Sequence, residues 1–420
     1  MTLLDDRMIA PAVGAERYQS SSHRRLLAQV EAAPGRRPLN AIIVPTIRPA
    51  STLTGVIALA RSYSAALLVL CSGRARASEV AALAGRDRNV TSVDVTGLRR
   101  LMPCFETTEI HRRTQRQPLG DLSLKRNLGL IIARTAGWER ILFLDDDIDI
   151  PHFTDLEAVA SVADHFDAVG LNNNGFEDNS VVCHALRYIG GKQDTFVGGG
   201  AMVVRPGATT SFFPDIYNED WLFLLRNTSL GSVAAHGTML QREFDPFDTA
   251  SRAERQEFGD CLAEGIYWLL DRGSPLRHAD TRYWRESLRR RVQLINHIKG
   301  RMVNVPARAD SRAKLLASLT AALDAHTWIT PKMCNSYMNA WHRDRAAWRR
   351  HLRNHPMSMT PLLAEVACKE LGILVNCDLR PSAPRPDRLS VFDRSERING
   401  WPLPTSVPPP IVSYPPWFII

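Results

Sequence analysis

Four aspartates stand within five residues, at Asp145, Asp146, Asp147 and Asp149. They follow Ile141–Leu144, an apolar run long enough for one buried strand. Neighbouring carboxylates repel one another and resist removal from water, so a bound cation and its anionic ligand would stabilise this cluster. Residues i and i+2 of a strand face the same side, which lets Asp145 and Asp147 converge on one ligand while Asp146 points elsewhere. The run predicts a cation site, and an acidic, solvated loop is the alternative.

A calcium loop of the EF-hand type is excluded for this run. Counted from Asp145, such a loop needs glycine at its sixth position and glutamate at its twelfth. The sequence has Ile150 and Leu156 there.

Before the aspartate run, short apolar segments alternate with segments of helical spacing. We expect strands over residues 40–44, 66–70 and 90–95, and helices over 53–63 and 78–83. This alternation is typical of an α/β fold with a doubly wound, mostly parallel sheet, in which ligands bind at the carboxyl ends of the strands. Thr46–Arg48, Cys71–Arg74 and the aspartate run all fall at such ends.

Basic residues precede the aspartate run. Arg99–Leu119 carries several arginines and few apolar residues, so we expect a loop or irregular insertion beside the site. A helix is predicted over 121–135, with Lys125 and Arg126 near its N-terminal end. Backbone N–H groups and basic side chains together favour phosphate there, whereas surface charges on an ordinary helix are the alternative.

Two further motifs follow the aspartate run. Gly198, Gly199 and Gly200 come directly before a predicted buried strand, where a ligand or another backbone would have to approach closely. Glu219 and Asp220 head a predicted amphipathic helix. A loop without a ligand and a simple helix cap are the respective alternatives.

The composition is that of an ordinary soluble globular protein, with 420 residues, 45% hydrophobic and 23% charged. The formal net charge of +8 points to anionic partners but does not identify them. The seven cysteines include no C-x-x-C pair, which argues against a disulfide scaffold or a structural zinc site and favours the cytoplasm. We see no signal peptide, and no apolar run approaches the ~20 residues needed to cross a bilayer.

Taken in order, these motifs resemble the nucleotide-sugar-dependent glycosyltransferases of the GT-A fold, in particular the large family-2-like group. The resemblance covers roughly residues 39–250 and rests on five motifs that are weak singly. They are the opening strand Ile42–Thr46, Arg126–Gly129 on the helix, Leu144–Asp147 as the D-x-D motif, Gly198–Met202, and the Glu219–Asp220 pair.

The resemblance implies roles for these residues. Asp147 would be the main ligand of Mn²⁺ or Mg²⁺ on the donor diphosphate, and Asp145 would touch the ribose or the metal. Asp220, with Glu219 beside it, matches the acidic residue that accepts the acceptor's proton. The remaining donor- and acceptor-binding positions would be Pro45, Thr46, Arg48, Lys125, Arg126, Asp146, Gly199 and Gly200.

This chain departs from the family pattern at two places. Cys71–Gly73 stands where many members have an aspartate that reads the nucleotide base, so the base is not predicted. For the late histidine that many members supply to the metal, His236 is the candidate, although a structural role is the commoner one for such a residue; Asp245 is a less conventional choice.

Two other functions remain open. Ile43–Arg48 with the triple aspartate is also similar to the UDP-arabinopyranose mutase group, which would rearrange a UDP-sugar on the same site without an external acceptor. A basic nucleic-acid-binding protein is the alternative of another class. We expect no nucleic acid, because no binding module is recognisable and the carboxylates would repel phosphate unless a metal intervened.

The expected domain organisation has four parts. They are an N-terminal arm at 1–37 with one helix over 24–32, the GT-A domain at 38–250, a mainly helical region at 251–380, and a proline-rich extended tail at 381–420. Ser251–Glu254 is a capping-box pattern before a helix over 252–271. For the basic helix over 284–302 we expect a solvated or salt-bridged face, and an anionic acceptor, a membrane surface or nucleic acid are the alternatives. The apolar end of the tail is expected to pack on the body or on a second subunit.

Overall fold

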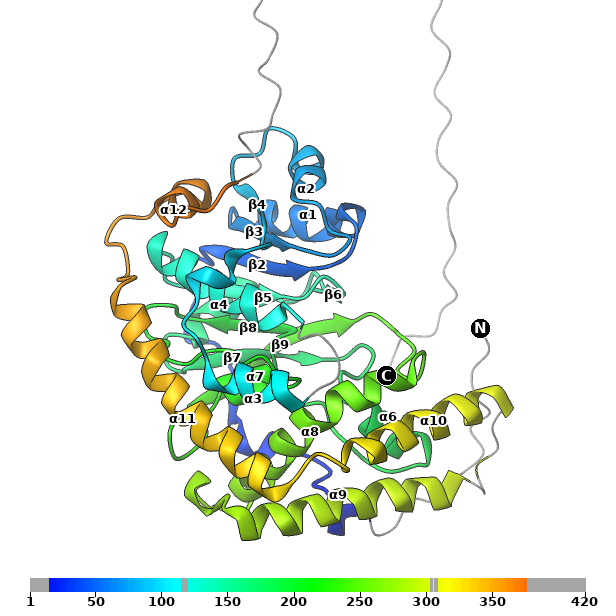
Figure 1. The fold of residues 1–420 in the computed structure, drawn as a ribbon. Helices are drawn as coiled ribbons and strands as arrows, with labels where there is room; N and C mark the ends of the chain where they lie inside the picture. The colour runs from blue at the N-terminus through cyan, green and yellow to red at the C-terminus, as the bar shows by residue number, and fades with distance from the viewer. Residues whose placement is uncertain (1–14, 115–119, 303–304, 306–308, 376–420) are drawn as a thin grey trace, which may run out of the picture. The chain divides into compact units, whose positions relative to one another are not determined.

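The centre of the molecule is a nine-stranded, mostly parallel sheet (Figure 1). The computed structural model describes residues 15–375 apart from 115–119, 303–304 and 306–308. The strands are β1 (Ala28–Gln29), β2 (Ala41–Thr46), β3 (Ala66–Cys71), β4 (Val90–Asp94), β5 (Ile141–Leu144), β6 (Ile148–Asp149), β7 (Ala168–Asn173), β8 (Ala201–Val204) and β9 (Val233–Gln241). Their order is β1-β9-β7-β8-β5-β2-β3-β4, and β6 pairs with β9.

Strand β8 runs antiparallel to both of its neighbours, β5 and β7. The pairs β2–β3, β2–β5, β3–β4 and β7–β9 are parallel. The expectation of an α/β fold with a mostly parallel sheet is therefore confirmed at this level. The first three predicted strands and the two helices between them are present as β2, β3, β4, α1 (Thr54–Ser62) and α2 (Ala77–Ala84).

Alternate residues of the central strands face two different hydrophobic layers, as the period of two in a strand requires. Ile42 and Leu142 pack with helices α1, α2 and α5 (Leu156–Val162) on one face. Ile43 and Phe143 face α4 (Leu122–Thr135) and the C-terminal helices on the other. Strands β2 and β5 are thus covered on both sides and carry apolar residues at almost every position.

Helix α4 packs directly against the middle of the sheet. A Cβ at Gly129 would lie 3.0 Å from Cγ2 of Ile43, so a glycine here allows the close approach. Every residue of α4 from Ser123 to Ala133 is buried. The helix therefore holds its N-terminal residues firmly beside the ends of β2 and β5.

Helices make up most of the chain after β9. They are α8 (Ala250–Asp271), α9 (Thr281–Arg301), α10 (Ala309–Ala325), α11 (Pro331–Arg353) and α12 (Ala364–Glu370). Figure 1 shows α11 running along the same side of the sheet as α4, with α12 beyond it. In the described part of the chain, no helix is both long enough and apolar enough to span a bilayer.

The prediction of a loop over Arg99–Leu119 is wrong for Glu106–Thr114, which forms helix α3. Its first N–H groups are satisfied by a distant residue. The carboxylate of Asp344 on α11 accepts hydrogen bonds from the N–H groups of Glu106 and Thr107, at 2.9 and 2.8 Å. The short polar sequence of α3 carries no sign of this partner. Residues 115–119 lie outside the described residues.

Two smaller predictions, the helix over residues 24–32 and the capping box at Ser251, are also wrong. Residues 24–32 contain a short 3₁₀ helix, Arg24–Leu26, followed by β1, which pairs with β9 at the edge of the sheet. Helix α8 begins after Thr249 and has no side-chain cap, so Ser251 lies inside the helix. The arm before residue 15 and the tail at 381–420 lie outside the described residues.

Candidate functional site

The order of the strands reverses between β2 and β5. The chain goes from β2 to β3 and β4 on one side, whereas β8, β7 and β9 lie beyond β5 on the other. In open α/β sheets, ligands bind in the crevice at such a point, outside the carboxyl ends of the strands. Thr46 ends β2 and the aspartate run follows β5. The two are joined by a hydrogen bond of 2.5 Å from Oγ1 of Thr46 to Oδ2 of Asp146.

Arg48 bridges two carboxylates of the run. Its Nη2 lies 2.9 Å from Oδ2 of Asp147, and its Nη1 forms an ion pair with Asp146. Partial burial works against the charge on Arg48, but Asp147 and Asp146 outweigh it and raise the pKa of the guanidinium. The side chains of Arg48 and Asp147 remain 39% and 25% exposed, so a ligand can reach both from solvent.

Arg126 bridges the aspartate run and the acidic pair on α7 (Glu219–Phe223). Its Nη2 donates to both carboxylate oxygens of Asp145, at 2.9 and 3.0 Å, and its Nη1 forms an ion pair with Glu219. Burial raises the pKa of Asp145 to about 6 against the opposing effect of Arg126. Burial and the neighbouring Asp220 likewise raise the pKa of Glu219.

The glycine motif lies against this charged group. The N–H of Gly199 donates to Oδ2 of Asp220 at 2.7 Å, and the N–H of Trp221 donates to Oδ1 at 2.9 Å. A Cβ at Gly198 would collide with the Asp220 carboxylate, and one at Gly199 would collide with the Arg126 guanidinium. A side chain at Gly198 or Gly199 would therefore displace the end of Asp220 or Arg126, whereas a Cβ at Gly200 would have ordinary contacts.

A cavity of about 170 Å³ opens where these elements meet. Of the predicted site residues, Arg126, Asp145, Gly200, Glu219 and Asp220 line it. Its other polar or charged lining residues include Asp178, Asn179, Ser180, Cys183, Tyr217, Asn218, Asp260 and Glu264.

A second, larger cavity of about 530 Å³ lies on the other side of the run, between α1 and the segment after β6. Asp145, Asp146, Asp149, His152 and Arg242 are its charged or titratable lining residues. Asp145 lines both cavities. The first carboxylate of the run therefore stands in a wall that the two cavities share.

Lys125 does not take the place that was predicted for it. It is 1% exposed, and its Nζ lies within 2.9 Å of the Thr46 carbonyl oxygen, the Ser72 hydroxyl and the Asp121 carboxylate. It lines neither cavity. Its contacts join the ends of β2 and β3 to α4, which is a structural task. Pro45 and Thr46 are likewise buried at the end of β2.

His236 is not brought together with the aspartate run as a third metal ligand. In the part of the chain that the structure describes, two groups of three side chains place metal-type ligand atoms within 4.8 Å of one another. They are Glu257, Cys261 and His326, and Cys183, Asp260 and Glu264. Neither contains Asp145, Asp147 or His236.

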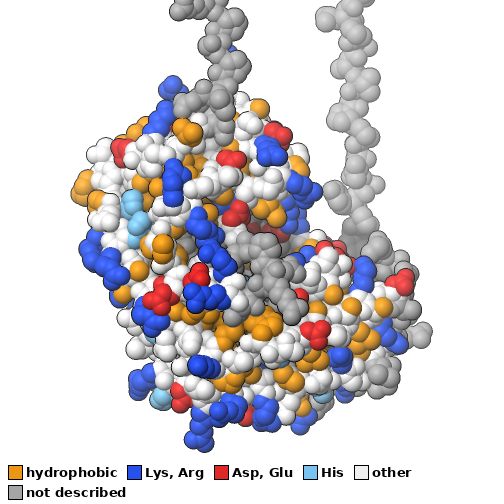
Figure 2. Space-filling model, viewed as in Figure 1, with side chains coloured by type: hydrophobic (Ala, Val, Ile, Leu, Met, Phe, Trp, Pro, Cys, Tyr) orange, Lys and Arg blue, Asp and Glu red, His pale blue; other side chains and the backbone are white. Residues whose placement is uncertain are grey.

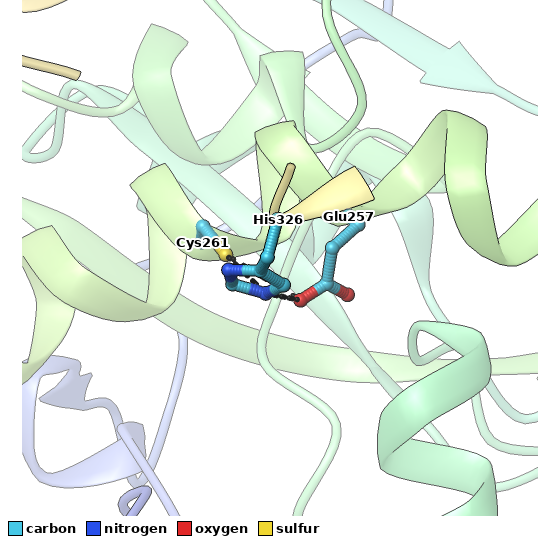
Figure 3. A group of neighbouring side chains, drawn as sticks. All are labelled: Glu257, Cys261 and His326. Carbon is cyan, nitrogen blue, oxygen red and sulfur yellow. Dashed lines mark hydrogen bonds and ion pairs between the residues drawn. The ribbon is translucent and has the colours of Figure 1, made fainter. Parts of the chain in front are cut away.

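Both of these groups belong to a buried network of ion pairs and hydrogen bonds. Figure 3 shows Glu257 and Cys261 on α8 facing His326, with Nε2 of His326 at 2.9 Å from Oε1 of Glu257. Arg291 on α9 binds Glu257 through two contacts of 2.9 Å and also pairs with Asp260. Burial opposes ionisation of Glu257, but Arg291 and His326 outweigh it and lower its pKa to about 2. Protein cations thus already hold these carboxylates.

Helix α6 (Val181–Tyr188) and its preceding loop supply some of the site residues that the sequence did not reveal. Ser180 caps α6 by accepting from the N–H of Cys183, and its hydroxyl donates to Asp260 at 2.6 Å. The segment Asp178–Ser180 before an apolar run is a pattern typical of a helix start, which could have located this element. No local sequence pattern predicts that Asp260 faces the cavity.

The surface seen in Figure 2 has Lys and Arg side chains scattered among acidic and apolar ones. The net charge of +8 is therefore not gathered into one basic surface on this face. Acidic side chains instead gather in the smaller cavity. Comparison of the sequence with protein-family models gives no match, and comparison with curated proteins finds no significant similarity.

Proposed function

We propose that the protein is a glycosyltransferase of the GT-A type, which transfers a sugar from a nucleotide-diphosphate sugar to an acceptor with the help of Mn²⁺ or Mg²⁺. The observation that best supports the proposal is that Asp145 lines both cavities. The larger cavity, at about 530 Å³, has the size of a small-molecule site, and the smaller one holds the candidate base Asp220. A donor and an acceptor could thus meet at the aspartate run.

The sheet supports the same proposal. The aspartate run follows a central strand at the point where the strand order reverses, and β8 carries the glycine motif alongside it. A mostly parallel sheet with this arrangement is compatible with a GT-A domain.

Asp145 and Asp147 fit a hard divalent cation. Carboxylate oxygens are the ligands that Mg²⁺ and Mn²⁺ prefer, and such ions are commonly held by one or two carboxylates together with substrate phosphates. Both side chains are about one quarter exposed, at 27% and 25%. The bound ion would supply positive charge that stabilises the departing nucleoside diphosphate. No third protein ligand is needed for this mode of binding.

The chain's own residues would perform the remaining steps. Arg48, which pairs with Asp147 and is partly exposed, would contact the diphosphate. Arg126 keeps Asp145 and Glu219 in place through its two ion pairs. Asp220, fixed by two backbone N–H groups, would accept the proton of the acceptor hydroxyl as it attacks the sugar.

The test is a thermal-shift and calorimetric screen of UDP-, GDP-, TDP- and CDP-sugars with and without Mn²⁺. We expect one nucleotide class to bind only with the metal, and Asp147→Asn to abolish that binding. Glu139→Gln, which removes an exposed carboxylate outside both cavities, is the control and should bind normally. Binding that ignores both the metal and Asp147 would contradict the proposal, and conversion of a donor sugar without any acceptor would favour the mutase reaction.

A further inference from the structure

Carboxyl groups far outnumber lysine and arginine side chains in the lining of the smaller cavity. Six of its lining residues carry a carboxylate, and Arg126 is the one lysine or arginine among the described residues that line it. The six are Asp145, Asp178, Glu219, Asp220, Asp260 and Glu264. Arg126 is already shared between Asp145 and Glu219, so the other four carboxyl groups have no lysine or arginine partner among the lining residues.

Cations behind the wall of the cavity balance only part of this charge. Arg291 pairs with Asp260 but also with Glu257, and His23 pairs with Glu264 but also with Asp271. Each of these cations is therefore divided between a lining carboxylate and a second carboxylate outside the cavity.

Asp178 is the least compensated member of the set. Its side chain is exposed, and no ion pair or hydrogen bond of its carboxylate is found among the described residues. Although solvent reaches it, the surrounding protein and the charges of Asp220 and Asp145 raise the pKa of Asp178 to about 7. A cation entering the cavity would remove this repulsion.

Aromatic side chains complete the cavity. Phe196, Tyr217 and Trp221 line it, and the rings of Phe196 and Trp221 are 5.1 Å apart. Aromatic faces attract organic cations, and together with carboxylates they suit an ammonium group on a carbon skeleton better than a hydrated metal ion.

Arg126 provides a separate sign of a ligand. Its side chain is only 3% exposed, yet its Nε has no hydrogen-bond partner among the described residues. A buried donor without a partner is costly, and a small turn of the Arg126 side chain toward the cavity would let a ligand oxygen accept a hydrogen bond from Nε. These features together favour a ligand with both a cationic group and an oxygen acceptor.

We propose that the smaller cavity binds an acceptor that carries a protonated amine beside its hydroxyl groups, such as an amino sugar or an aminocyclitol. This inference rests on the proposed function and names its acceptor class. The ammonium is the anchor, held by Asp178 and the aromatic rings, and it does not react. A neighbouring hydroxyl forms the new C–O bond, its proton passes to Asp220, and the sugar–phosphate bond breaks with its electrons leaving on the nucleoside diphosphate.

The experiment measures acceptor binding to the full chain by ligand-observed NMR titration, near neutral pH and with EDTA present. Glucosamine is the cationic probe, and glucose and N-acetylglucosamine are its neutral counterparts. We expect glucosamine to bind about tenfold more tightly than either, the order of effect that one partly desolvated cation contact provides. Equal binding of the three sugars would overturn the inference.

Two matched variants locate the anchor. Asp178→Asn should lower the affinity for glucosamine about fivefold or more while leaving glucose binding unchanged. Glu177→Gln removes the same charge one residue away, on a side chain that pairs with Arg187 and lies outside the cavity, and should bind as the unaltered protein does. Unchanged glucosamine binding in Asp178→Asn would contradict the role of this residue. Because the assay contains neither donor nor metal, its result is independent of the metal-dependent donor binding that tests the proposed function.

Discussion

Asp220 combines two properties that a catalytic base needs, a fixed direction and access to a cavity. The N–H groups of Gly199 and Trp221 each bind one of its oxygens, and the carboxylate lines the smaller cavity. Glu219 differs from it, since that side chain is 5% exposed and is engaged with Arg126. In the proposed enzyme, Asp220 would therefore transfer the proton and Glu219 would position Arg126.

Replacing Asp220 with asparagine tests this assignment. Asparagine keeps the size and offers an oxygen to one of the two backbone N–H groups, but it cannot accept a proton at neutral pH. We expect donor binding to persist while the transfer rate falls by about 10²- to 10⁴-fold, the usual contribution of a general base. Calorimetry with the donor and chromatography of the product measure the two quantities. A variant that transfers at the normal rate would remove Asp220 from this role.

Elements were predictable from the sequence where local pattern decides their structure, and less so where distant partners do. The strands β2, β3 and β5 are buried on both faces, so their apolar runs are unambiguous. Helix α3 was missed because its N-terminus is capped by Asp344, more than two hundred residues away. The carboxylates of the aspartate run were visible, but Asp260 and Glu264 reach the cavity only through the packing of α8. The burial of Lys125 was not predictable either, because its partners Thr46 and Ser72 lie far away in the sequence.

The N-terminal segment before β1 is fastened to α8 by a charged contact. His23 is 2% exposed and lies 2.7 Å from Oδ2 of Asp271 and 3.1 Å from Oε2 of Glu264. Burial opposes protonation of this imidazole, but its hydrogen bonds with Asp271 and Glu264 outweigh that effect and raise the pKa of His23 to about 9. The folded protein therefore binds this proton more strongly than the unfolded chain does.

This contact makes stability depend on pH in a defined direction. Because the pKa is raised from 6.5 to about 9, the stabilisation is complete below pH 6.5 and is lost as the pH rises through about 9. We expect His23→Gln to lower the free energy of unfolding at pH 6 by on the order of 3 kcal/mol, and to differ much less above pH 9.5. Urea unfolding across this range measures the difference. Arg25→Gln, which alters an exposed partner of Asp271, is the control, and a pH-independent effect of His23→Gln would contradict the charged contact.

At the scale of the molecule, the helices after residue 250 share a hydrophobic core with the sheet. One continuous cluster contains Ile43 and Phe143 of the central strands, Phe258 of α8 and Trp341 of α11. The segment after α11 also binds the end of α4, where the N–H of Ser358 donates to the Arg134 carbonyl oxygen at 2.9 Å. The α/β elements and the C-terminal helices thus cover one another's apolar surfaces.

We therefore expect the full chain to lose its sheet and its C-terminal helices in a single unfolding transition. Near-ultraviolet circular dichroism follows the packing of Trp284, Trp341 and Trp348, which are fully buried, and far-ultraviolet circular dichroism follows the whole backbone. The two denaturation curves should coincide. A chain ending at residue 250 should fail to fold, since it exposes the core surface that α8 and α11 cover. Two separate transitions would show that the parts fold independently.

Arg48 gives the aspartate run an internal counterion. Its guanidinium forms ion pairs with both Asp146 and Asp147. In the proposed enzyme, a metal can claim Asp147 fully only if Arg48 releases it, and the anion that arrives with the metal is a new partner for Arg48. Metal and diphosphate would then favour each other's binding reciprocally, as thermodynamic linkage requires. Because Arg48 and the metal would compete for Asp147, a metal ion alone would bind weakly. A metal ion that arrives with the donor diphosphate would bind more tightly.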